Sequence, residues 1–361
     1  MQNFQAEQAR AEASKRWAAE PKPDTPSGWV KRAAEAAEVL KLDAVDRDAA
    51  SKPPFIEVQL LKDAGLVNLL GPRDFGGGGE TWQTSYKVTT EIAKADGSIG
   101  HLIGNHYSWY DSHLDLIPFW SSQILGTPLQ ARRWLREFTE GNYYLGGAVN
   151  PRNADMVARD VGDALVFNGD KFFSTGMWWL RHSQYAYHDF ILPPVQLQFA
   201  AVHLGVGIGA LEAAAEYTRT KTRAWPYGGD DKEKATDEWY IREGYGRLQA
   251  TLWAAEALVD RTAERISKLI HAPREDLTQQ ARGEIAVQVA ASKATAIEAT
   301  ITVSSKLFEL TGASSSLSKY GFDRFWRNTR VHSLHDPIAY KFREVGGWAL
   351  LGEVPEPSWY T

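Results

Sequence analysis

The sequence contains no cysteine among its 361 residues. This absence excludes a disulfide framework, a thiolate metal site and a thiol nucleophile. Nowhere do about eighteen apolar residues follow one another, the length that marks a membrane-spanning helix, and the first residues lack the apolar core of a signal peptide. We therefore predict a cytoplasmic protein that does not enter a membrane.

A basic surface field is missing as well. The 40 Lys and Arg residues are outnumbered by 45 Asp and Glu residues, which gives a net charge of −5 and a pI near 6.0. Binding to nucleic acid relies on positive charge that neutralises phosphates. The sequence therefore argues against a nucleic acid partner.

Two glycine-rich stretches lack the residues that nucleotide-binding loops require. Residues 76–79 are four glycines, but the Lys-Ser/Thr pair of a phosphate loop does not follow them. Gly205, Gly207 and Gly209 lie in a helical pattern with Gly-x-Gly-x-Gly spacing, which is not the dinucleotide-binding fingerprint. We predict that these three glycines let neighbouring helices pack closely.

The residues that are present indicate a soluble globular protein of two or three domains. Hydrophobic residues make up 43% of the chain and charged residues 24%, and the length exceeds that of a typical single core. The 14 tryptophans fit either an ordinary core, which is the more common case, or cavities for flat ligands.

The hydrophobic pattern divides the chain into three parts. Residues 1–140 are expected to form an N-terminal helical domain, residues 141–192 a middle β domain with a hairpin turn signal at Asn168-Gly169, and residues 193–361 a C-terminal four-helix bundle. Helices are expected at 1–20, 29–46, 56–65, 82–95 and 99–116, and the bundle helices at 195–223, 239–269, 274–312 and 336–351.

Histidines collect on the expected helix 99–116. His101 and His106 are five residues apart and point about 140° away from each other around a helix, so they are poorly placed to share a metal ion. Asn105, His106 and Trp109 are candidates for the lining of a polar and aromatic pocket. A histidine satisfied inside the core is the alternative for His106.

A second pair of histidines precedes the expected last helix. Asp336 is predicted to be the N-cap of that helix and Pro337 its first residue. His332 and His335 would then lie near the positive end of the helix dipole, which opposes protonation of an imidazole. A neutral histidine there could hydrogen-bond an oxygen that carries developing charge.

Five segments carry a resemblance to a known family. They are residues 61–66, 72–77, 95–102, 168–176 and 325–337, and the last is the most specific. Together with the order of helices, β segment and bundle, they resemble the acyl-CoA dehydrogenase fold. Within that superfamily the chain is similar to the flavin-dependent monooxygenases, which include dibenzothiophene monooxygenases and related sulfur- and nitrogen-oxidising enzymes.

The resemblance implies roles for individual residues. The predicted catalytic residues are His101, His335, His332 and Asn328, and the first two would flank the activated oxygen. The predicted flavin-binding residues are Ser174, Thr175, Gly147, Asn150, Arg223 and Arg330, with Arg223 reaching a flavin phosphate across a subunit interface. A plain surface position is the alternative for both arginines.

The function that the resemblance implies is a two-component monooxygenase. It would take reduced flavin, FMN in preference to FAD, from a separate NAD(P)H:flavin reductase. A C4a-hydroperoxyflavin formed with O2 would oxygenate a sulfur or nitrogen centre of an aromatic or apolar molecule. The family also implies a homotetramer. The alternatives are an acyl-CoA dehydrogenase with bound FAD, which would have to use Asp336 as its base, and a helical interaction protein that binds no flavin.

One departure from the family concerns the middle domain. The family has a β barrel of about twice the length found in residues 141–192, and the chain passes from Gly176 to bundle helix with little strand between. The junction at Met177-Trp178 favours the interpretation that a loop-rich part of the barrel is absent from this sequence, and the alternative is that the protein has lost half of the barrel that covers the flavin.

Overall fold

The computed structural model describes residues 2–110, 128–146, 157–160, 165–168, 192–227, 232–273, 276–358 and 361. The helices of these residues are α1 (Gln2–Ala19), α2 (Pro26–Lys41), α3 (Ala44–Ala50), α4 (Phe55–Asp63), α5 (Trp82–Ala95), α6 (Gly97–Trp109), α7 (Pro128–Glu140), α8 (Leu192–Thr220), α9 (Trp239–Ile270), α10 (Gln279–Thr311), α11 (Asp323–Ser333) and α12 (Ile338–Leu351). The strands are β1 (Val157–Asp160) and β2 (Leu165–Asn168).

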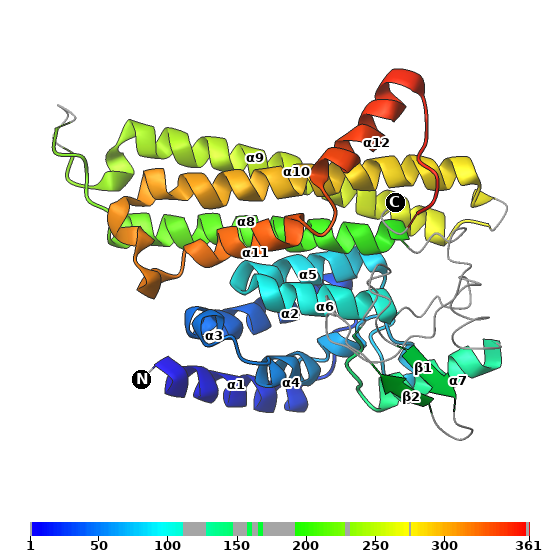
Figure 1. Cartoon of the computed structure of the whole chain (residues 1–361). Coiled ribbons are helices and arrows are strands. Elements are labelled where there is room, and N and C mark those ends of the chain that lie inside the picture. The colour runs from blue at the N-terminus through cyan, green and yellow to red at the C-terminus, as the bar shows by residue number, and fades with distance from the viewer. Residues whose placement is uncertain are drawn as a thin grey trace.

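Two hydrophobic cores share one helix. The long helices α8, α9 and α10 lie side by side, α5 and α6 lie against α8, and α1 to α4 lie beyond them (Figure 1). Trp82, Tyr86 and Ala93 of α5 belong to the core of the bundle, whereas Val88 and Ile92 of the same helix belong to the N-terminal core. Because α5 is buried on both faces, it fixes the N-terminal helices on the bundle.

Helix α8 is the central helix of the bundle. Within the described residues, its stretch Pro193–Thr220 is the one helix that is long and apolar enough to cross a membrane by composition, yet 83% of its most apolar window is buried inside the protein. Helices α5, α9 and α10 cover it. Its apolar character is therefore accounted for by its place in the core.

The predicted close packing at the three glycines is confirmed. A Cβ atom on Gly205 would lie 2.7 Å from the Cβ atom of Ala93, and one on Gly209 would overlap the backbone carbonyl of Lys94. A Cβ atom on Gly207 would lie 2.7 Å from Oγ1 of Thr300 on α10. The glycines thus let α8 approach α5 on one side and α10 on the other.

The predicted β barrel is not confirmed. Between α7 and α8, the described residues contain one two-stranded antiparallel sheet, in which Val157 pairs with Asn168 and Asp160 with Leu165. Strand β2 ends at Asn168, where the turn was predicted. Strand β1, which has only 4 residues, and helix α7 were not predicted, although Thr127-Pro128 is a sequence pattern typical of a helix start.

Most expected helices are confirmed to within a few residues, but the fourth bundle helix is corrected. The residues 336–351 do form a helix, α12, yet its main helix contact is with α10, and it rises at an angle to the bundle (Figure 1). The helix that packs along α8, α10 and α6 is α11. It was missed because its polar sequence, with charged residues at Asp323, Arg324, Arg327 and Arg330, conceals a short buried face.

The close approach of α8 to α5 gives a first prediction. Replacing Gly209 with Ala should lower the stability by about 1–3 kcal/mol, because the new Cβ meets backbone that cannot move away easily. Gly246 of α9 is the control position, because it is exposed and a Cβ atom there would meet no atom within 4 Å. Gly246→Ala should therefore leave the stability unchanged or raise it by up to about 1 kcal/mol. Urea unfolding of the two variants measures the difference, and equal midpoints would contradict the packing argument.

Candidate functional site

Three helices bring three imidazoles together. His101 comes from α6, His203 from α8 and His332 from α11. The ring centroids of His101 and His332 are 4.4 Å apart. Atom Nδ1 of His332 lies 2.9 Å from Nε2 of His203, which is hydrogen-bond distance. His332 is therefore the middle member of the cluster.

The contact between α6 and α11 depends on a short first turn of α6. Asp96 caps α6 by accepting hydrogen bonds from the backbone N–H groups of Ser98 (2.9 Å) and Ile99 (3.2 Å). Gly97 follows, and Asn328 of α11 packs against it, since a Cβ atom there would lie 3.3 Å from Nδ2 of Asn328. One turn further along each helix are His101 and His332, because residues four apart share a face.

Phe199 closes the cluster from α8. Its ring centroid lies 4.8 Å from that of His332 and 5.8 Å from that of His101, in both cases edge to face. Phe199 and His203 are four residues apart on one face of α8. The histidines thus have an apolar aromatic neighbour and contact one another.

The surroundings keep these histidines neutral. Burial lowers the pKa of His101 to about 4 and that of His203 to about 3. Burial, together with the charges that neighbouring histidines would carry, also holds the pKa of His332 well below its ordinary value. At neutral pH all three rings are uncharged and can each donate one hydrogen bond and accept another.

Two nitrogens of the cluster are left over. Among the described residues, Nε2 of His332 and Nδ1 of His203 are buried and have no hydrogen-bond partner. A buried polar atom without a partner costs free energy and usually indicates a role or a ligand. The ring of His332 lies against that of His101, so the two rings offer a small polar site inside apolar surroundings.

The predicted N-cap at Asp336 was wrong. Pro337 has the N-cap position of α12, and no side-chain hydrogen bond caps the helix. The carboxylate of Asp336 is instead buried and paired with Lys293 of α10, and Nζ of Lys341 lies 3.7 Å from its Oδ2. The two lysines compete successfully with the backbone for the carboxylate because a buried charge needs an opposite charge beside it.

Consequently the surroundings of His332 and His335 differ from each other and from the predicted place before a capped helix. His332 lies in the last turn of α11, at its negative end, and not before a helix. His335 lies in the turn between α11 and α12, keeps 46% of its side chain exposed, and places Nδ1 3.2 Å from Oδ1 of Asp336. Burial rather than the helix dipole therefore keeps His332 neutral, and His335 is at the rim of the cluster.

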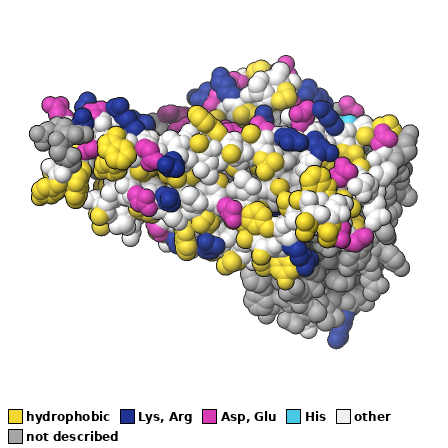
Figure 2. Space-filling view, turned by 90° about the horizontal axis from the view of Figure 1, so that it is seen from above, with side chains coloured by type: hydrophobic (Ala, Val, Ile, Leu, Met, Phe, Trp, Pro, Cys, Tyr) yellow, Lys and Arg dark blue, Asp and Glu magenta, His cyan; other side chains and the backbone are white. Residues whose placement is uncertain are grey.

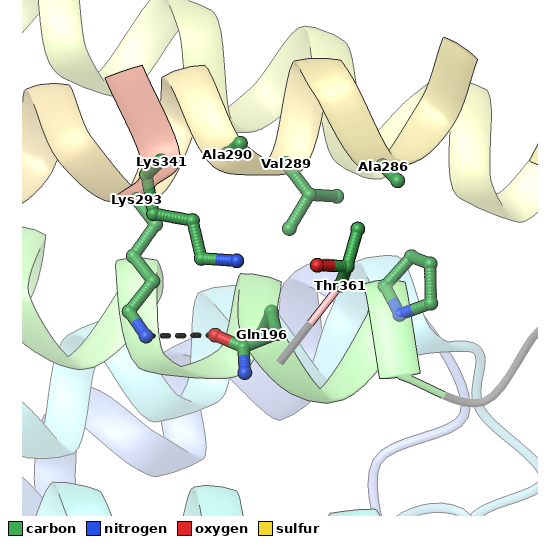
Figure 3. Close-up of a pocket in the computed structure, with 8 residues that line it drawn as sticks. Gln196, Ala286, Val289, Ala290, Lys293, Lys341 and Thr361 are labelled. Carbon is green, nitrogen blue, oxygen red and sulfur yellow. Dashed lines mark hydrogen bonds between the residues drawn. The ribbon is translucent and has the colours of Figure 1, made fainter. Parts of the chain in front are cut away.

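A buried charge network lies beside the cluster. Lys293 donates a hydrogen bond of 2.7 Å to Oε1 of Gln196 (Figure 3). It also pairs with Asp336. Burial lowers the pKa of Lys293 to about 8, although Asp336 opposes the shift. Lys293, Lys341 and Thr361 line a cavity of about 10 Å³, roughly the space of one ordered water.

This network argues against Asp336 as the base of a dehydrogenase. Burial alone would raise the pKa of Asp336, but the hydrogen bond from His335 and the charge of Lys293 outweigh it, and the net effect lowers the pKa. A carboxylate held in ion pairs is a weak base and is not free to face a substrate.

The other predicted pocket residues are divided between two places. Asn105 lies on the same face of α6 as His101, one turn later. His106 points into the N-terminal core, where its Nε2 lies 2.7 Å from the carbonyl oxygen of Val67 and its Nδ1 accepts a hydrogen bond of 2.8 Å from the N–H of Leu145. Both nitrogens are occupied, which favours the alternative of a satisfied core histidine. The Trp109 side chain lies outside the described part.

The predicted flavin-binding residues are not gathered around the cluster. Arg223 is exposed and follows the last residue of α8, and Arg330 stacks on Trp326, with its Cζ 5.7 Å from the ring centroid. Gly147, Asn150, Ser174 and Thr175 lie outside the described residues. Within the described ranges no group of three or more His, Cys, Asp or Glu side chains could hold a metal ion.

Three residues of the site were missed by sequence reasoning. His203, Phe199 and Lys293 all lie in long helices whose periodic pattern predicted only core packing. A signal was available for two of them, because a histidine and a lysine interrupt otherwise apolar helix faces and both are fully buried. A polar residue on a core face needs a partner, and the sequence does not reveal which one.

Known proteins resemble this chain in both sequence and fold. The family model described as "Acyl-CoA dehydrogenase, N-terminal domain" matches residues 30–142, and "Acyl-CoA dehydrogenase, C-terminal domain" matches residues 197–339. A dibenzothiophene monooxygenase of Mycolicibacterium goodii is 33% identical over 87% of this chain and 91% of its own. A probable FMNH2-dependent monooxygenase, SfnC of Pseudomonas putida, is 27% identical over 88% of this chain and 93% of its own.

Two solved structures extend the comparison. Dibenzothiophene monooxygenase TdsC from Paenibacillus sp. A11-2 has a TM-score of 0.79 and 30% identity over 92% of this chain and 99% of its own. It has also been solved with FMN and indole. Methanesulfinate monooxygenase MsuC from Pseudomonas fluorescens has a TM-score of 0.81 and 27% identity over the same shares. The alignment with the M. goodii protein spans 393 positions, more than the 361 residues here, so that relative carries residues that this chain lacks.

The buried ion pair gives a prediction about stability. Replacing Asp336 with Asn should destabilise the fold by about 3–5 kcal/mol, because Lys293 stays buried without its counter-charge. Adding Lys293→Met to Asp336→Asn should recover part of that loss. Replacing exposed Glu216, which pairs with Arg219 on the surface, with Gln should cost no more than about 1 kcal/mol. Urea midpoints measure the stability of these variants and of Lys293→Met alone. If the losses of Asp336→Asn and Lys293→Met add up to the loss of the double variant, the result contradicts the pairing.

Proposed function

Because the chain belongs to the acyl-CoA dehydrogenase superfamily, in its flavin-dependent monooxygenase branch, we propose that it is a reduced-flavin-dependent monooxygenase that oxidises a sulfur centre. The finer proposals are that the flavin is FMN and that a separate NAD(P)H:flavin reductase supplies it in the cytoplasm. The names of the relatives, which include an FMNH2-dependent enzyme and an FMN complex, support this choice of cofactor.

The observation that carries the proposal is the neutral histidine cluster of α6, α8 and α11. A dehydrogenase requires a free carboxylate to remove a proton from carbon, and among the described residues Asp336 is held in ion pairs. An oxygenase requires hydrogen bonds to an oxygen in a water-poor site. His101 and His332 meet that requirement, since both are neutral and Nε2 of His332 has no partner in the described part of the chain.

The residues present fit a flavin that reacts with O2. Reduced flavin supplies two electrons and two protons, so that one oxygen atom enters the substrate as S=O and the other leaves as water. The task of the chain is to hold the proton and exclude bulk water. The ring of Phe199 excludes water at one side, and His332 and His101 offer the hydrogen bonds. Asn328 supports them by fixing α11 against α6.

Arg223, the arginine proposed to bind the cofactor phosphate, does not lie at the histidine cluster of its own subunit. Arg223 is twenty residues beyond His203, which is roughly 30 Å at the helical rise of 1.5 Å per residue. If Arg223 binds a phosphate, it does so in the site of another subunit. Its neighbours Trp225 and Tyr227 are 57% and 82% exposed, and such aromatic side chains favour an interface. We therefore include a homotetramer with shared sites in the proposal.

Hydrophobic side chains elsewhere on the bundle support assembly as well. Seen from above, they gather among charged ones on the outer face (Figure 2). Trp253 of α9 is 62% exposed and Trp348 of α12 is 47% exposed. Large exposed aromatic side chains in such numbers are unusual for a surface that faces water alone.

The substrate is proposed to be a sulfur compound, with a nitrogen heteroatom as the wider class. The named relatives act on molecules as different as dibenzothiophene and methanesulfinate, so similarity leaves the size of the molecule open. The aromatic lining at Phe199 favours a flat or apolar molecule.

The test of the function uses the purified chain with FMN, NADH, a flavin reductase and dibenzothiophene. Sulfoxide formation that stops when O2 is removed supports the proposal. Replacing His332 with Asn should reduce sulfoxide yield about 100-fold, with NADH oxidation continuing and hydrogen peroxide released. His335→Asn should cost much less, because His335 lies at the rim. Oxidation of a thioester by an artificial acceptor without O2, and no sulfoxide, would overturn the proposal.

The shared-site proposal has its own test. Arg223→Ala should weaken FMN binding about 10- to 100-fold, the loss expected for a charged hydrogen bond to phosphate. Arg219→Ala, one turn earlier and paired with Glu216, is the matched control and should leave binding unchanged. Fluorescence titration with FMN measures both affinities. Equal affinities in the two variants would remove Arg223 from the flavin site.

A further inference from the structure

We propose that His203 is a positioning residue for His332. Its hydrogen bond determines which ring nitrogen of His332 carries the proton, and it makes Nε2 of His332 a hydrogen-bond donor. This inference rests on the proposed function for its consequence in catalysis. The hydrogen bond itself, between Nε2 of His203 and Nδ1 of His332 at 2.9 Å, does not depend on any cofactor.

Only two proton arrangements are compatible with this contact. The two facing nitrogens cannot both carry a proton, since the hydrogens would collide, and two facing lone pairs would repel. In the first arrangement His203 donates from Nε2–H, and His332 then has its proton on its own Nε2. In the second arrangement His332 donates from Nδ1–H, which leaves Nε2 of His332 as a bare acceptor and puts the proton of His203 on its orphaned Nδ1.

The first arrangement is favoured for two reasons. Within the described residues each arrangement leaves one N–H and one lone pair without a partner, on Nε2 of His332 and Nδ1 of His203. An oxygen bound at Nε2 of His332 would accept from the N–H of the first arrangement, whereas the second would still leave the N–H on Nδ1 of His203 unpaired, and orphaned buried N–H groups are rare. The first arrangement also uses the Nε2–H tautomer on both rings, which is the more stable form of neutral imidazole in histidine.

The position of His203 supports a fixed orientation. Its ring is 1% exposed, and its backbone carbonyl accepts a hydrogen bond of 2.7 Å from Oγ1 of Thr300 on α10. The groups that face it are His332 and His101, Lys293 of α10 and Asp336 before α12. Because the ring is wedged between helices, it cannot turn to offer its other nitrogen.

The consequence concerns the reaction. With the proton on Nε2, His332 can donate a hydrogen bond to an oxygen that carries negative charge, whereas a bare Nε2 would repel it. A partner that fixes a histidine tautomer is a recurring device at active sites, and its loss there costs about 10- to 100-fold in activity. His203 would act on the reaction only through His332 and would touch neither substrate nor flavin.

The experiment reads the tautomer directly. Protein labelled with 15N-histidine, free of flavin, is studied by solid-state NMR, which separates protonated from bare ring nitrogens. The chain has nine histidines, and the His332 signals are assigned as those lost in His332→Asn. In the wild type Nε2 of His332 should be protonated and Nδ1 bare. A proton on Nδ1 of His332 would overturn the proposal without any variant.

Two substitutions of His203 separate positioning from packing. His203→Phe removes the donor and should leave His332 as a mixture of tautomers. His203→Gln places an amide N–H near the former Nε2 and should restore the single tautomer. A cooperative thermal unfolding transition is measured for both variants to check that they are folded. An unchanged His332 tautomer in folded His203→Phe overturns the proposal.

Activity completes the test. His203→Phe should lower the yield of oxygenated product per NADH oxidised about tenfold, and His203→Gln should retain most of the yield. Equal losses in the two variants, with the same tautomer in both, would mean that His203 only fills space. If neither the wild type nor any variant makes product, the proposed function fails. The NMR result still decides the role of His203 in that case.

Discussion

The structure depends on the close approach of α8 to α5. Gly205 and Gly209 remove the side chains that would hold the two helices apart, and α5 is the helix that both cores share. The gain from burying both faces of α5 is realised only if the backbones come into contact. Because α6 follows α5 after a one-residue break at Asp96, the same contact brings α6 against α8. The position of His101 beside His332 therefore depends on this helix packing as well as on the first turn of α6.

Charged groups in the interior determine the protonation state of the histidines that packing brings together. Two lysines, Lys293 and Lys341, and one carboxylate, Asp336, lie buried beside three imidazoles. Since the lysines hold the carboxylate, its negative charge is largely neutralised and does not draw a proton onto the histidines. The ion pair costs desolvation free energy, and burying it is rarely the most stable solution for a fold. Its effect is a site in which histidines remain uncharged donors and acceptors.

Helices of strong periodicity could be predicted from the sequence, and interactions that cross between helices could not. The bounds of α5 and the beginning of α9 match the expectation, because Thr81 to Asp96 and Glu238 onward show a clear amphipathic pattern. His101, His332 and Asn328 were named as partners by resemblance, and the structure does bring them to one place. The pairing of Asp336 with Lys293 was not predicted, since 43 residues separate them in the chain and a local Asp-Pro sequence gave a plausible cap. Local patterns describe a helix, whereas buried charges are decided by what lies opposite them.

One corner of the bundle bears on the choice between dehydrogenation and oxygenation. Dehydrogenation requires a free carboxylate, whose basicity permits deprotonation of carbon. In this chain the corner has Asp336 paired with lysines, with the exposed His335 and the partly buried His332 nearby. A neutral imidazole cannot remove a weakly acidic carbon proton effectively, but it can hold a proton against an oxygen without a net charge that would attract water. In the function proposed above, a fixed neutral imidazole therefore takes the place of an available carboxylate, and the packing of α5, α8 and α10 supports the site that holds it.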